Sequence, residues 1–445
     1  MESSGDGQAA RTDRTLAVRS VRVDPPETRA LRRALDRPRL VWATDGNRTV
    51  AGGSAATITA DGPDRFTAVR ERAEALFAGL AAPDTPPQAR PRLYGGFSFT
   101  DTHTDPGDGA TWAGYPGARF VLPAVQFTET PAESWLTTAA TGADADSRAA
   151  ARLERWRDRI AELPSPAPST PPGIVDRSYA PPLTDWQREI DEATERIRRG
   201  DLRKVVLAQA LSARLSEPVE PAAVLDRLGH AYPDCFRFLF EPDGGGSFFG
   251  ATPEQLVAVD GHEVTTEALA GSIGRGETTD EDEWLAEQLR TSEKNSHEHE
   301  IVVETIREQL DGLAAEITTG PRTVRKLANV QHLQTPIRAR LDGDRHVVEL
   351  VEALHPTPAV GGLPPERALE TIRETEVFDR GWYASPVGWI DAEGNGSFAV
   401  AIRSALARGR EATLFAGAGI VADSDPDEEW DELQLKYRPI LEELV

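Results

Sequence analysis

The sequence predicts an α+β fold in which mainly antiparallel sheets are covered by outer helices. Several strand-like segments between residues 236 and 270 follow one another without a helix between them. Such runs favour antiparallel sheets over a doubly wound parallel sheet. Helix-like segments with apolar residues at a spacing of three to four stand before and after these runs, as expected of helices that pack on the outside of a sheet.

The first 173 residues mix both kinds of element. Residues 1–15 are polar, and we expect them to be disordered. Strand-like alternation follows at 39–43, 92–99 and 119–125, and helix-like periodicity at 66–81 and 146–163. The Pro- and Ser-rich stretch 163–173 is typical of a linker or a surface crossing. We therefore divide the chain into an N-terminal half of the α+β unit, 16–173, and a second region, 174–445.

The second region begins with a helix over 184–199 that Gly200 ends. The periodicity then predicts helices over 221–230, 280–314, 365–374 and 426–443, and strands over 202–213, 236–240, 246–250, 255–259, 263–270, 386–391, 397–404 and 412–420.

Composition excludes several classes of function. The chain has 445 residues and a formal net charge of -24, and no run of basic residues offsets this charge. Neither nucleic acid nor an anionic membrane surface is therefore an expected partner. A single cysteine, Cys235, rules out an intrachain disulfide and a multi-cysteine metal centre. The N-terminus lacks an apolar signal segment, so we expect a cytoplasmic protein.

Lysine is scarce. The only lysines are Lys204, Lys294, Lys326 and Lys436, so arginine supplies nearly all of the 49 basic residues. Together with the excess of acid, this bias suggests a protein from a halophile, with GC-rich codon usage as the alternative explanation. A lysine that is kept in such a chain is a candidate for a role that arginine cannot fill, because only lysine has a compact head whose pKa burial can lower.

Lys204 is the first such candidate. Strand side chains alternate, so Lys204 shares a face with Val206, Ala208 and Ala210. A lysine that faces an apolar layer can act as a general base. The alternative is an edge lysine whose ammonium reaches solvent.

The last helix carries a second candidate. Glu429, Glu432 and Lys436 stand at i, i+3 and i+7 and share one helix face. With the acidic segment SEKNSHEHE of the helix over 280–314, they could provide carboxylates from two helices for Mg²⁺. The alternative is a solvated acidic surface. His297 and His299 point away from each other on a helix, which makes a zinc site improbable.

Three further features are weaker. GAGIVA, 417–422, matches the glycine pattern of a dinucleotide-binding loop, but acidic residues rather than a helix follow it, so we expect a tight glycine turn facing a carboxylate. Arg403 is expected to share a strand face with Ala399 and Ala401, where it could clamp a carboxylate. Glu254 stands at the start of a strand.

Taken together, these segments resemble the chorismate-utilising enzymes, which include anthranilate, aminodeoxychorismate, salicylate and isochorismate synthases. The resemblance covers about 179–443 and runs in family order through KVVLAQAL, GATPEQLV, ALAGSIGRG, SEKNSHEHE, NVQHLQTP, LHPTPAVGGLP, GWYASPVGWID, SFAVAIRSA, LFAGAGIV and EEWDELQLK. The first 160 residues, with RLYGGFSF, are similar to the less distinctive N-terminal half of these enzymes. The resemblance implies two stacked, mainly antiparallel sheets between outer helices, with 174–445 as the chorismate-binding region.

The resemblance also implies roles for individual residues. Lys204 would activate water and Glu254 would protonate the leaving hydroxyl. Glu298 and Glu432 would bind Mg²⁺, with Glu429 nearby. The substrate would contact Gly271, Ser272, His332, Ala359, Tyr383, Arg403, Gly417, Gly419 and Lys436.

The branch of the family follows from Lys204 and Ala359. Anthranilate synthases are similar but have Gln in place of Lys204, because ammonia rather than activated water attacks. Aminodeoxychorismate and salicylate synthases share the lysine but typically have Thr at Ala359. The combination of Lys204 with Ala359 resembles isochorismate synthases, and Val360 resembles their menaquinone-pathway form. We therefore expect Mg²⁺-dependent conversion of chorismate to isochorismate without a glutaminase subunit. The alternatives are a salicylate synthase and, in a different class, a dinucleotide-binding oxidoreductase.

Overall fold

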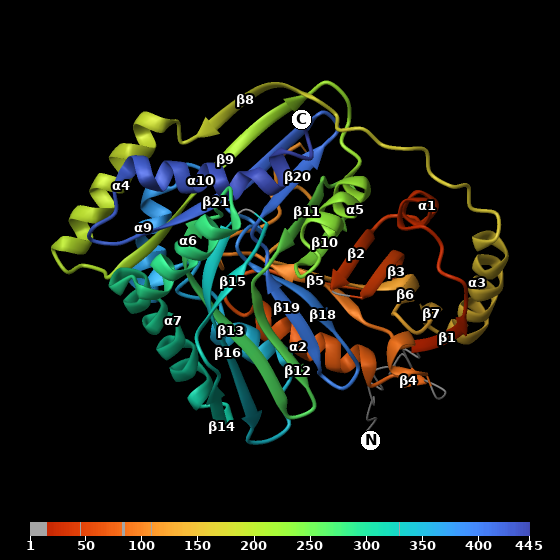
Figure 1. Ribbon diagram of the computed structural model, residues 1–445. Helices are drawn as coiled ribbons and strands as arrows, with labels where there is room; N and C mark the ends of the chain where they lie inside the picture. The colour runs from red at the N-terminus through yellow and green to blue at the C-terminus, as the bar shows by residue number, and fades with distance from the viewer. Residues whose placement is uncertain (1–15, 45, 82–84, 108, 329) are drawn as a thin grey trace, which may run out of the picture.

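The computed structural model describes residues 16–445 except 45, 82–84, 108 and 329 (Figure 1). The expected disorder of 1–15 lies outside the described residues. In the described part, the strands form one hydrogen-bonded network, and all its pairings are antiparallel except that of β1 with β4. The network has two arms that diverge from the pair β3 and β6.

The first arm joins strands from both regions of the chain. From its outer edge to β6, its order is β8 (Ile174–Ala180), β9 (Lys204–Leu215), β21 (Glu411–Ile420), β20 (Ser404–Arg408), β11 (Ser247–Thr252), β10 (Phe236–Glu241), β2 (Arg39–Thr44), β3 (Asn47–Ala60) and β6 (Ala118–Glu129). Beyond β6 lie β7 (Ser134–Thr141), β1 (Leu16–Arg22) and β4 (Leu80–Ala81), and the short β17 (Gly362–Leu363) pairs with the start of β9.

The second arm also starts from β6. Its order is β5 (Leu93–Phe97), β18 (Pro386–Ile390), β19 (Gly396–Val400), β12 (Gln255–Asp260), β13 (Glu263–Gly274) and β16 (Val330–Leu341), and both β14 (Ala314–Thr319) and β15 (Thr323–Lys326) pair with β16.

Strand β6 is the junction because its two halves have different neighbours. Residues 118–121 pair with β5, and residues 125–129 pair with β7, while β3 pairs along the other edge. The predicted α+β class with antiparallel sheets is therefore confirmed, and the two sheets are continuous through β3 and β6. The division of the chain at residue 173 stays a prediction.

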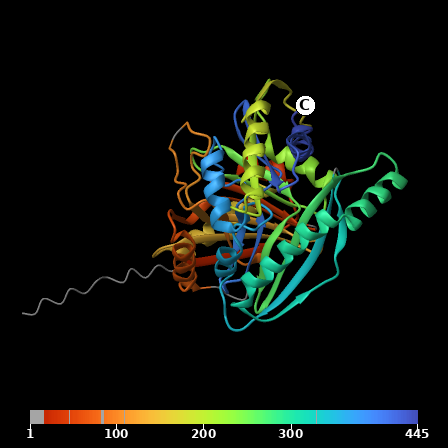
Figure 2. The same cartoon turned by 90° about the vertical axis from the view of Figure 1, so that its left-hand side faces the viewer.

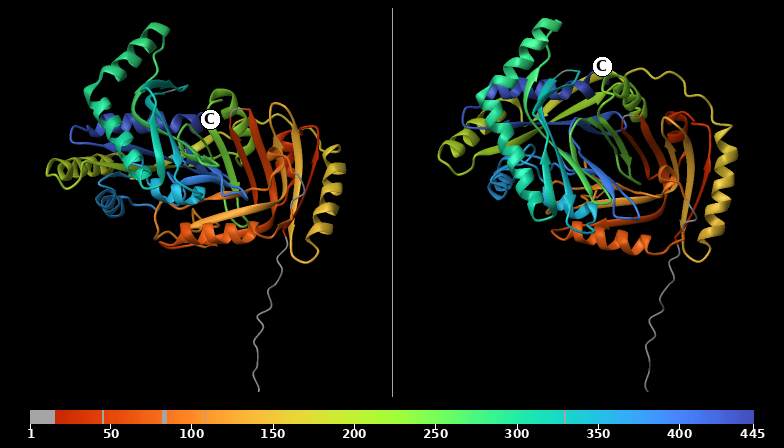
Figure 3. Two further views of the ribbon diagram at one scale, coloured as in Figure 1. Left: turned by 90° about the horizontal axis from the view of Figure 1, so that it is seen from below. Right: turned by 60° about the horizontal axis from the view of Figure 1, so that its bottom comes forward.

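Helices cover the outside of both arms. Their bounds are α1 (Thr28–Ala34), α2 (Arg65–Phe77), α3 (Ala145–Ile160), α4 (Leu183–Arg198), α5 (Pro221–Ala231), α6 (Thr279–Thr291), α7 (Glu293–Asp311), α8 (Val347–Leu354), α9 (Pro365–Thr375) and α10 (Pro426–Leu441), with a 3-10 turn at Pro87–Ala89. Helix α7 lies along β13, and α10 lies on β21 beside α4 (Figure 2). Helix α3 packs on β1 and β7 at the opposite end of the molecule (Figure 3).

Aromatic side chains fill the space between the arms. Phe97 of β5, Phe120 of β6 and Phe398 of β19 are in ring contact and fully buried. Trp382 contacts Phe240 of β10, and its indole N–H donates to the carbonyl of Pro116 at 2.8 Å. This packing fixes the second arm against the first, so a site that takes residues from both arms is held rigidly.

The structure corrects three predictions in the second region. The single helix expected over 280–314 is two helices, because Ser292 is extended and its hydroxyl accepts the N–H of Asn295 as the cap of α7. Helix α8 was not predicted, because its short apolar run shows no clear period. The strand expected over 397–404 ends at Val400, and Arg403 has a φ of 51°, so Arg403 does not share a strand face with Ala399 and Ala401.

Candidate active site

A cavity of about 280 Å³ lies between the two arms. The first arm contributes β9 and β21, the second contributes β13 and β16, and α7 and α10 close the side. The structure brings all fourteen predicted site residues to this one cavity: Lys204, Glu254, Gly271, Ser272, Glu298, His332, Ala359, Tyr383, Arg403, Gly417, Gly419, Glu429, Glu432 and Lys436. Their individual roles stay predictions. The volume suits one small organic acid, since pockets for larger ligands start at about 300 Å³.

Lys204 begins β9 and is buried, as the alternation of that strand predicts. Its side chain lines the cavity on the same face as Val206 and Ala208. The ammonium Nζ donates to Glu298 Oε1 of α7 at 2.6 Å. Lys204 therefore lies beside a carboxylate from the neighbouring helix rather than reaching solvent.

Glu254 lies in the segment that joins β11 to β12 and is also buried. Its backbone is fixed, because its N–H donates to Thr252 Oγ1 at 3.2 Å and its carbonyl accepts the N–H of Val400 at 3.0 Å. Burial, with the charge of Glu267 adding to it and nearby cations opposing it, raises the pKa of the Glu254 carboxyl to about 7. Glu254 can therefore carry a proton near neutral pH.

Helix α10 presents two carboxylates and one ammonium to the cavity. Lys436 Nζ donates to Glu432 Oε1 at 2.7 Å and to the carbonyl of Gly417 at 2.6 Å. Burial raises the pKa of Glu429 to about 7, and the charge of Glu432 adds to this effect. Oxygen Oε2 of Glu429 is buried and has no hydrogen-bond partner among the described residues. The predicted shared face of Glu429, Glu432 and Lys436 is therefore present.

This face fits a hard cation. A buried carboxylate oxygen without a donor, next to a second carboxylate, is stabilised by a bound positive charge. Within the described ranges, no three His, Cys, Asp or Glu residues are grouped so that they alone could hold a metal ion. Mg²⁺ is a hard cation that takes few protein oxygens and completes its shell with water and substrate. His299 is buried against the hydroxyl of Thr335 at 2.7 Å.

The second arm supplies the opposite wall. His332 Nδ1 of β16 lies 2.9 Å from Ser272 Oγ of β13. Burial, with the charges of Arg403 and Lys436 adding to it, lowers the pKa of His332 to about 3, so the ring is neutral. Its Nε2 is buried without a hydrogen-bond partner in the described part of the chain and lines the cavity. A neutral ring nitrogen there can hydrogen-bond a bound molecule.

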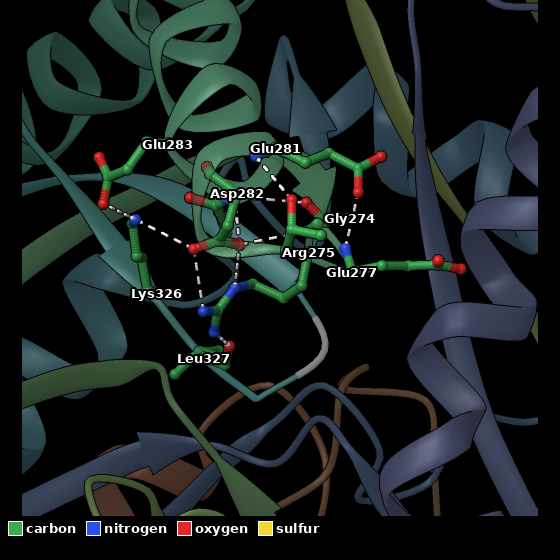
Figure 4. Close-up of polar contacts among 11 residues, drawn as sticks. Gly274, Arg275, Glu277, Glu281, Asp282, Glu283, Lys326 and Leu327 are labelled. Carbon is green, nitrogen blue, oxygen red and sulfur yellow. Dashed lines mark hydrogen bonds and ion pairs between the residues drawn. The ribbon is translucent and has the colours of Figure 1, made fainter.

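A polar network holds the ends of β13 and β16 behind this wall (Figure 4). Asp282 in the first turn of α6 binds Arg275 through both oxygens, and Lys326 Nζ donates to Asp282 Oδ2 at 3.0 Å. Gln331, next to His332 in sequence, donates to the Asp282 carbonyl at 3.2 Å. The pKa of Asp282 is lowered, first by the hydrogen bond from Arg275. This network ties α6 to the strand that carries His332.

Two glycines keep the floor of the cavity open. Gly417 and Gly419 lie inside β21, not in a turn, so the predicted glycine turn is wrong. A Cβ at Gly417 would lie 3.2 Å from the Tyr383 hydroxyl, and one at Gly419 would lie 3.0 Å from Lys204 Cε. The sequence pattern of β21 does not reveal why glycine is needed here, because the neighbouring Tyr383 and Lys204 come from other parts of the chain. No dinucleotide loop forms here, since α10 begins only at Pro426.

Arg403 reaches the cavity from the loop between β19 and β20 and is buried. Its guanidinium makes no hydrogen bond or ion pair with another described side chain. A buried guanidinium without a partner is well suited to a carboxylate of a bound molecule, because its two parallel N–H groups match the two carboxylate oxygens.

Sequence reasoning missed the ion pair of Glu376 and Arg380 behind β9. Arg380 donates to the carbonyls of Val206 at 2.7 Å and Val360 at 2.9 Å, and Glu376 accepts the N–H of Ala208 at 2.8 Å. Both side chains are almost fully buried. Strand β17 pairs with only the start of β9, and the side chains of Glu376 and Arg380 hydrogen-bond the next backbone groups along that edge. Arg380 also ties β9 to the loop that carries Ala359. Opposite charges at i and i+4, just before the motif GWYAS, were the available signal.

The sequence analysis also gave no site role to Lys294 and Glu428, which line the mouth of the cavity from α7 and α10. Lys294 could have been included, because it is one of four lysines and stands in the same segment as Glu298.

The cavity thus combines a proton carrier, a buried lysine on another wall, and separate cationic and anionic surfaces. Such a site can bind a small anionic molecule and transfer protons to or from it.

Comparison with known proteins points in the same direction. The family described as chorismate binding enzyme matches residues 8–445. A Pseudomonas aeruginosa protein named salicylate biosynthesis isochorismate synthase is 37% identical over 98% of this chain and 92% of its own length. Isochorismate synthase MenF of Bacillus subtilis is 39% identical over 80% of this chain and 74% of its own length.

A solved structure shares the fold over nearly the whole chain. The menaquinone-specific isochorismate synthase MenF from Escherichia coli superposes with a TM-score of 0.80 at 26% identity, covering 97% of this chain and 96% of its own. Anthranilate synthase component I from Streptococcus pneumoniae has a TM-score of 0.70 at 22% identity, covering 95% of this chain and 92% of its own, and shows the fold alone.

Proposed function

The chain belongs to the chorismate-binding enzymes, and we propose from this premise that it is an isochorismate synthase, an isomerase that converts chorismate to isochorismate. The observation that carries the proposal is that Lys204 and Glu254 both line one cavity. One residue can take a proton and the other, with a pKa of about 7, can give one near neutral pH. The relatives with this activity in their names support the same function.

The reaction needs two proton transfers, one from the water oxygen that attacks C2 and one to the hydroxyl oxygen that leaves C4. Lys204 holds a water molecule and accepts its proton while the oxygen bonds to C2. The ring double bonds shift, the bond from C4 to its hydroxyl breaks, and Glu254 gives its proton to the leaving oxygen. One water enters and one leaves, so no other reactant is needed.

Arg403, Lys436 and the neutral ring of His332 would bind and orient the substrate. Arg403 is the candidate clamp for a substrate carboxylate, because its guanidinium has no protein partner in the described residues.

We propose that Glu298 and Glu432 hold Mg²⁺, with Glu429 beside them. The buried free oxygen of Glu429 and the adjacent Glu432 support this placement. The ion would neutralise the C1 carboxylate of chorismate. Glu298 also binds Lys204, so a cation at this carboxylate would weaken the hold on the Lys204 ammonium.

Ala359 and Lys204 favour isochorismate as the final product. Both line the cavity, and the salicylate synthases that share the lysine typically have Thr at the position of Ala359. The lysine also favours water over ammonia as the nucleophile, so no glutaminase subunit is proposed. The names of the B. subtilis and E. coli proteins support a role in menaquinone biosynthesis, whereas the P. aeruginosa protein is named for salicylate biosynthesis.

A product assay tests the proposal. The purified protein is incubated with chorismate and MgCl₂, and the products are separated by chromatography and identified by NMR. We expect isochorismate, without added nicotinamide. Salicylate with pyruvate would favour the salicylate synthase instead, and no conversion of chorismate would refute both.

The location and origin of the protein stay proposals. In the described ranges, no helix is long and apolar enough to cross a membrane. We propose a cytoplasmic location on the basis of the sequence. The net charge of -24 and the scarcity of lysine support adaptation to high salt.

A further inference from the structure

Glu254 is held from behind by an ion pair that does not itself line the cavity. Arg325 of β15 and Glu267 of β13 form this pair, with Arg325 Nη1 at 3.0 Å from Glu267 Oε1. Both side chains are largely buried, with 17% and 10% of their surfaces exposed. Neither residue was among the predicted site residues. The pair therefore lies behind the active site, between the strands and the segment that carries Glu254.

The pair contacts both peptide groups that flank Glu254. Arg325 Nη1 also donates to the carbonyl of Pro253 at 3.0 Å, in the peptide group before Glu254. Glu267 Oε1 accepts the N–H of Gln255 at 3.4 Å, in the peptide group after it. One ion pair thus fixes the backbone on each side of the residue that carries the proton.

The rest of the pair is anchored to the sheet. Arg325 Nη2 donates to the carbonyl of Asp234 at 3.0 Å, before β10. Gln334 of β16 donates to the other oxygen of Glu267. Because these anchors come from both arms, a shift of either arm would move Glu254.

The charge of Glu267 also acts on Glu254. It is the strongest electrostatic influence that raises the pKa of Glu254, after burial. Arg403, Lys204 and Lys436 face Glu254 from the loop after β19, from β9 and from α10, and they act in the opposite direction. These three cations would favour the ionised carboxylate, which cannot protonate a leaving group.

We propose that Glu267 and Arg325 are positioning residues for Glu254: the ion pair fixes the peptide groups on both sides of the acid and places the Glu267 carboxylate behind it. This proposal rests on the proposed function for its kinetic consequences. The effect of the Glu267 charge on the protonation of Glu254 does not depend on which substrate the site binds.

A simple structural role predicts a different result. If the pair only stabilised the sheet, removing the charge of Glu267 would lower the melting temperature and leave the pH dependence unchanged. The discriminating measurement is therefore the pH at which Glu254 ionises.

The first experiment titrates Glu254 by infrared difference spectroscopy, using Glu254→Gln to assign its carboxyl band. In Glu267→Gln, which keeps the shape and can still bind Arg325, we expect the titration to move down by at least about half a pH unit. Glu263→Gln, an exposed position on the same strand, is the matched control and should not shift it. An unshifted titration in Glu267→Gln would overturn the proposal.

The second experiment uses turnover. Activity should fall as the pH rises through the pKa of Glu254, and this fall should begin at a lower pH in Glu267→Gln, with KM changed less than twofold. Arg325→Lys keeps the charge beside Glu267 but has a single nitrogen in place of Nη1 and Nη2, the two nitrogens of Arg325 that donate hydrogen bonds. We expect this variant to lose about tenfold in kcat without a shift in the pH profile.

The outcomes separate the two proposals. If wild-type protein forms no isochorismate, the proposed function fails, while the infrared titration still tests the control of Glu254 by Glu267. If wild-type protein is active but Glu267→Gln has the wild-type pH profile, only the inference about Glu267 fails. Wild-type kcat in Arg325→Lys would show that the hydrogen bond to Pro253 does not position the acid.

Discussion

Lys204 Nζ lies 2.6 Å from Glu298 Oε1, which joins the proposed base to a proposed ligand of Mg²⁺. The Lys204 ammonium and the proposed ion share the Glu298 carboxylate. The two roles are therefore coupled. This relationship makes Lys204 and the metal site the first two places to test.

Replacement of Lys204 should remove turnover more than binding. Lys204→Ala is expected to lose at least ~10²-fold in kcat, the typical contribution of general acid–base catalysis, with a small change in KM. Lys204→Arg should fail almost as badly, because arginine keeps the charge but cannot release a proton near neutral pH. Steady-state kinetics with chorismate measures both. Weaker binding with normal kcat would make Lys204 a carboxylate anchor.

Removal of divalent metal should stop the reaction. EDTA is expected to abolish turnover and Mg²⁺ to restore it, because the ion would offset the charge of the substrate carboxylate. Glu298→Gln and Glu432→Gln should each lose most of the activity and bind Mg²⁺ more weakly in calorimetry. Glu304→Gln, an exposed position on α7, is the control. Normal Mg²⁺ binding in both active-site variants would place the ion elsewhere.

The buried pair of Glu376 and Arg380 should contribute more to stability than an exposed pair nearby. Glu376→Gln leaves the Arg380 guanidinium buried without its counter-ion, so we expect a loss of about 3–5 kcal/mol in the free energy of unfolding. Glu370→Gln breaks the exposed pair with Arg367 in α9 and should cost less than about 1 kcal/mol. Urea unfolding compares the two. Equal losses would show that the pair does not anchor β9.

The net charge of -24 predicts a strong dependence on salt. Repulsion among the carboxylates destabilises the fold at low ionic strength, and the screening length falls from ~10 Å at 0.1 M to ~3 Å at 1 M salt. Melting temperature and activity should therefore rise between dilute buffer and molar KCl. A melting temperature that does not change over this range would contradict the proposed adaptation to salt.

Much of the fold follows from local sequence patterns. Alternation in 204–215 and 411–420 marks strands that are buried over most of their length, and the helix over 426–441 has a capping Asp425 followed by Pro426. The break at Ser292 and the positive φ of Arg403 were missed. The break rests on a local cap, in which the Ser292 hydroxyl accepts the N–H of Asn295, and the periodicity of a segment contains neither this cap nor the φ of Arg403.

The site was predicted to a large extent because its motifs resemble those of a known family. Lys204 could also be singled out from the residues alone, because lysine is scarce and its strand neighbours are apolar. Glu267 and Arg325 could not be, because each acts through backbone groups distant in sequence. For Glu376 and Arg380 the only signal was their opposite charges at i and i+4, which does not show that they bind the backbone of β9. Such contacts appear only once the strands are placed in register.

The most direct test of the account is the origin of the oxygen in the product. Chorismate is converted in H₂¹⁸O with Mg²⁺, and isochorismate from the first few per cent of the reaction is analysed by mass spectrometry and NMR. Water activated by Lys204 should place one ¹⁸O at C2, and the hydroxyl lost from C4 should appear as unlabelled water. Isochorismate without ¹⁸O would mean that the hydroxyl moves within the molecule, which would contradict attack by water.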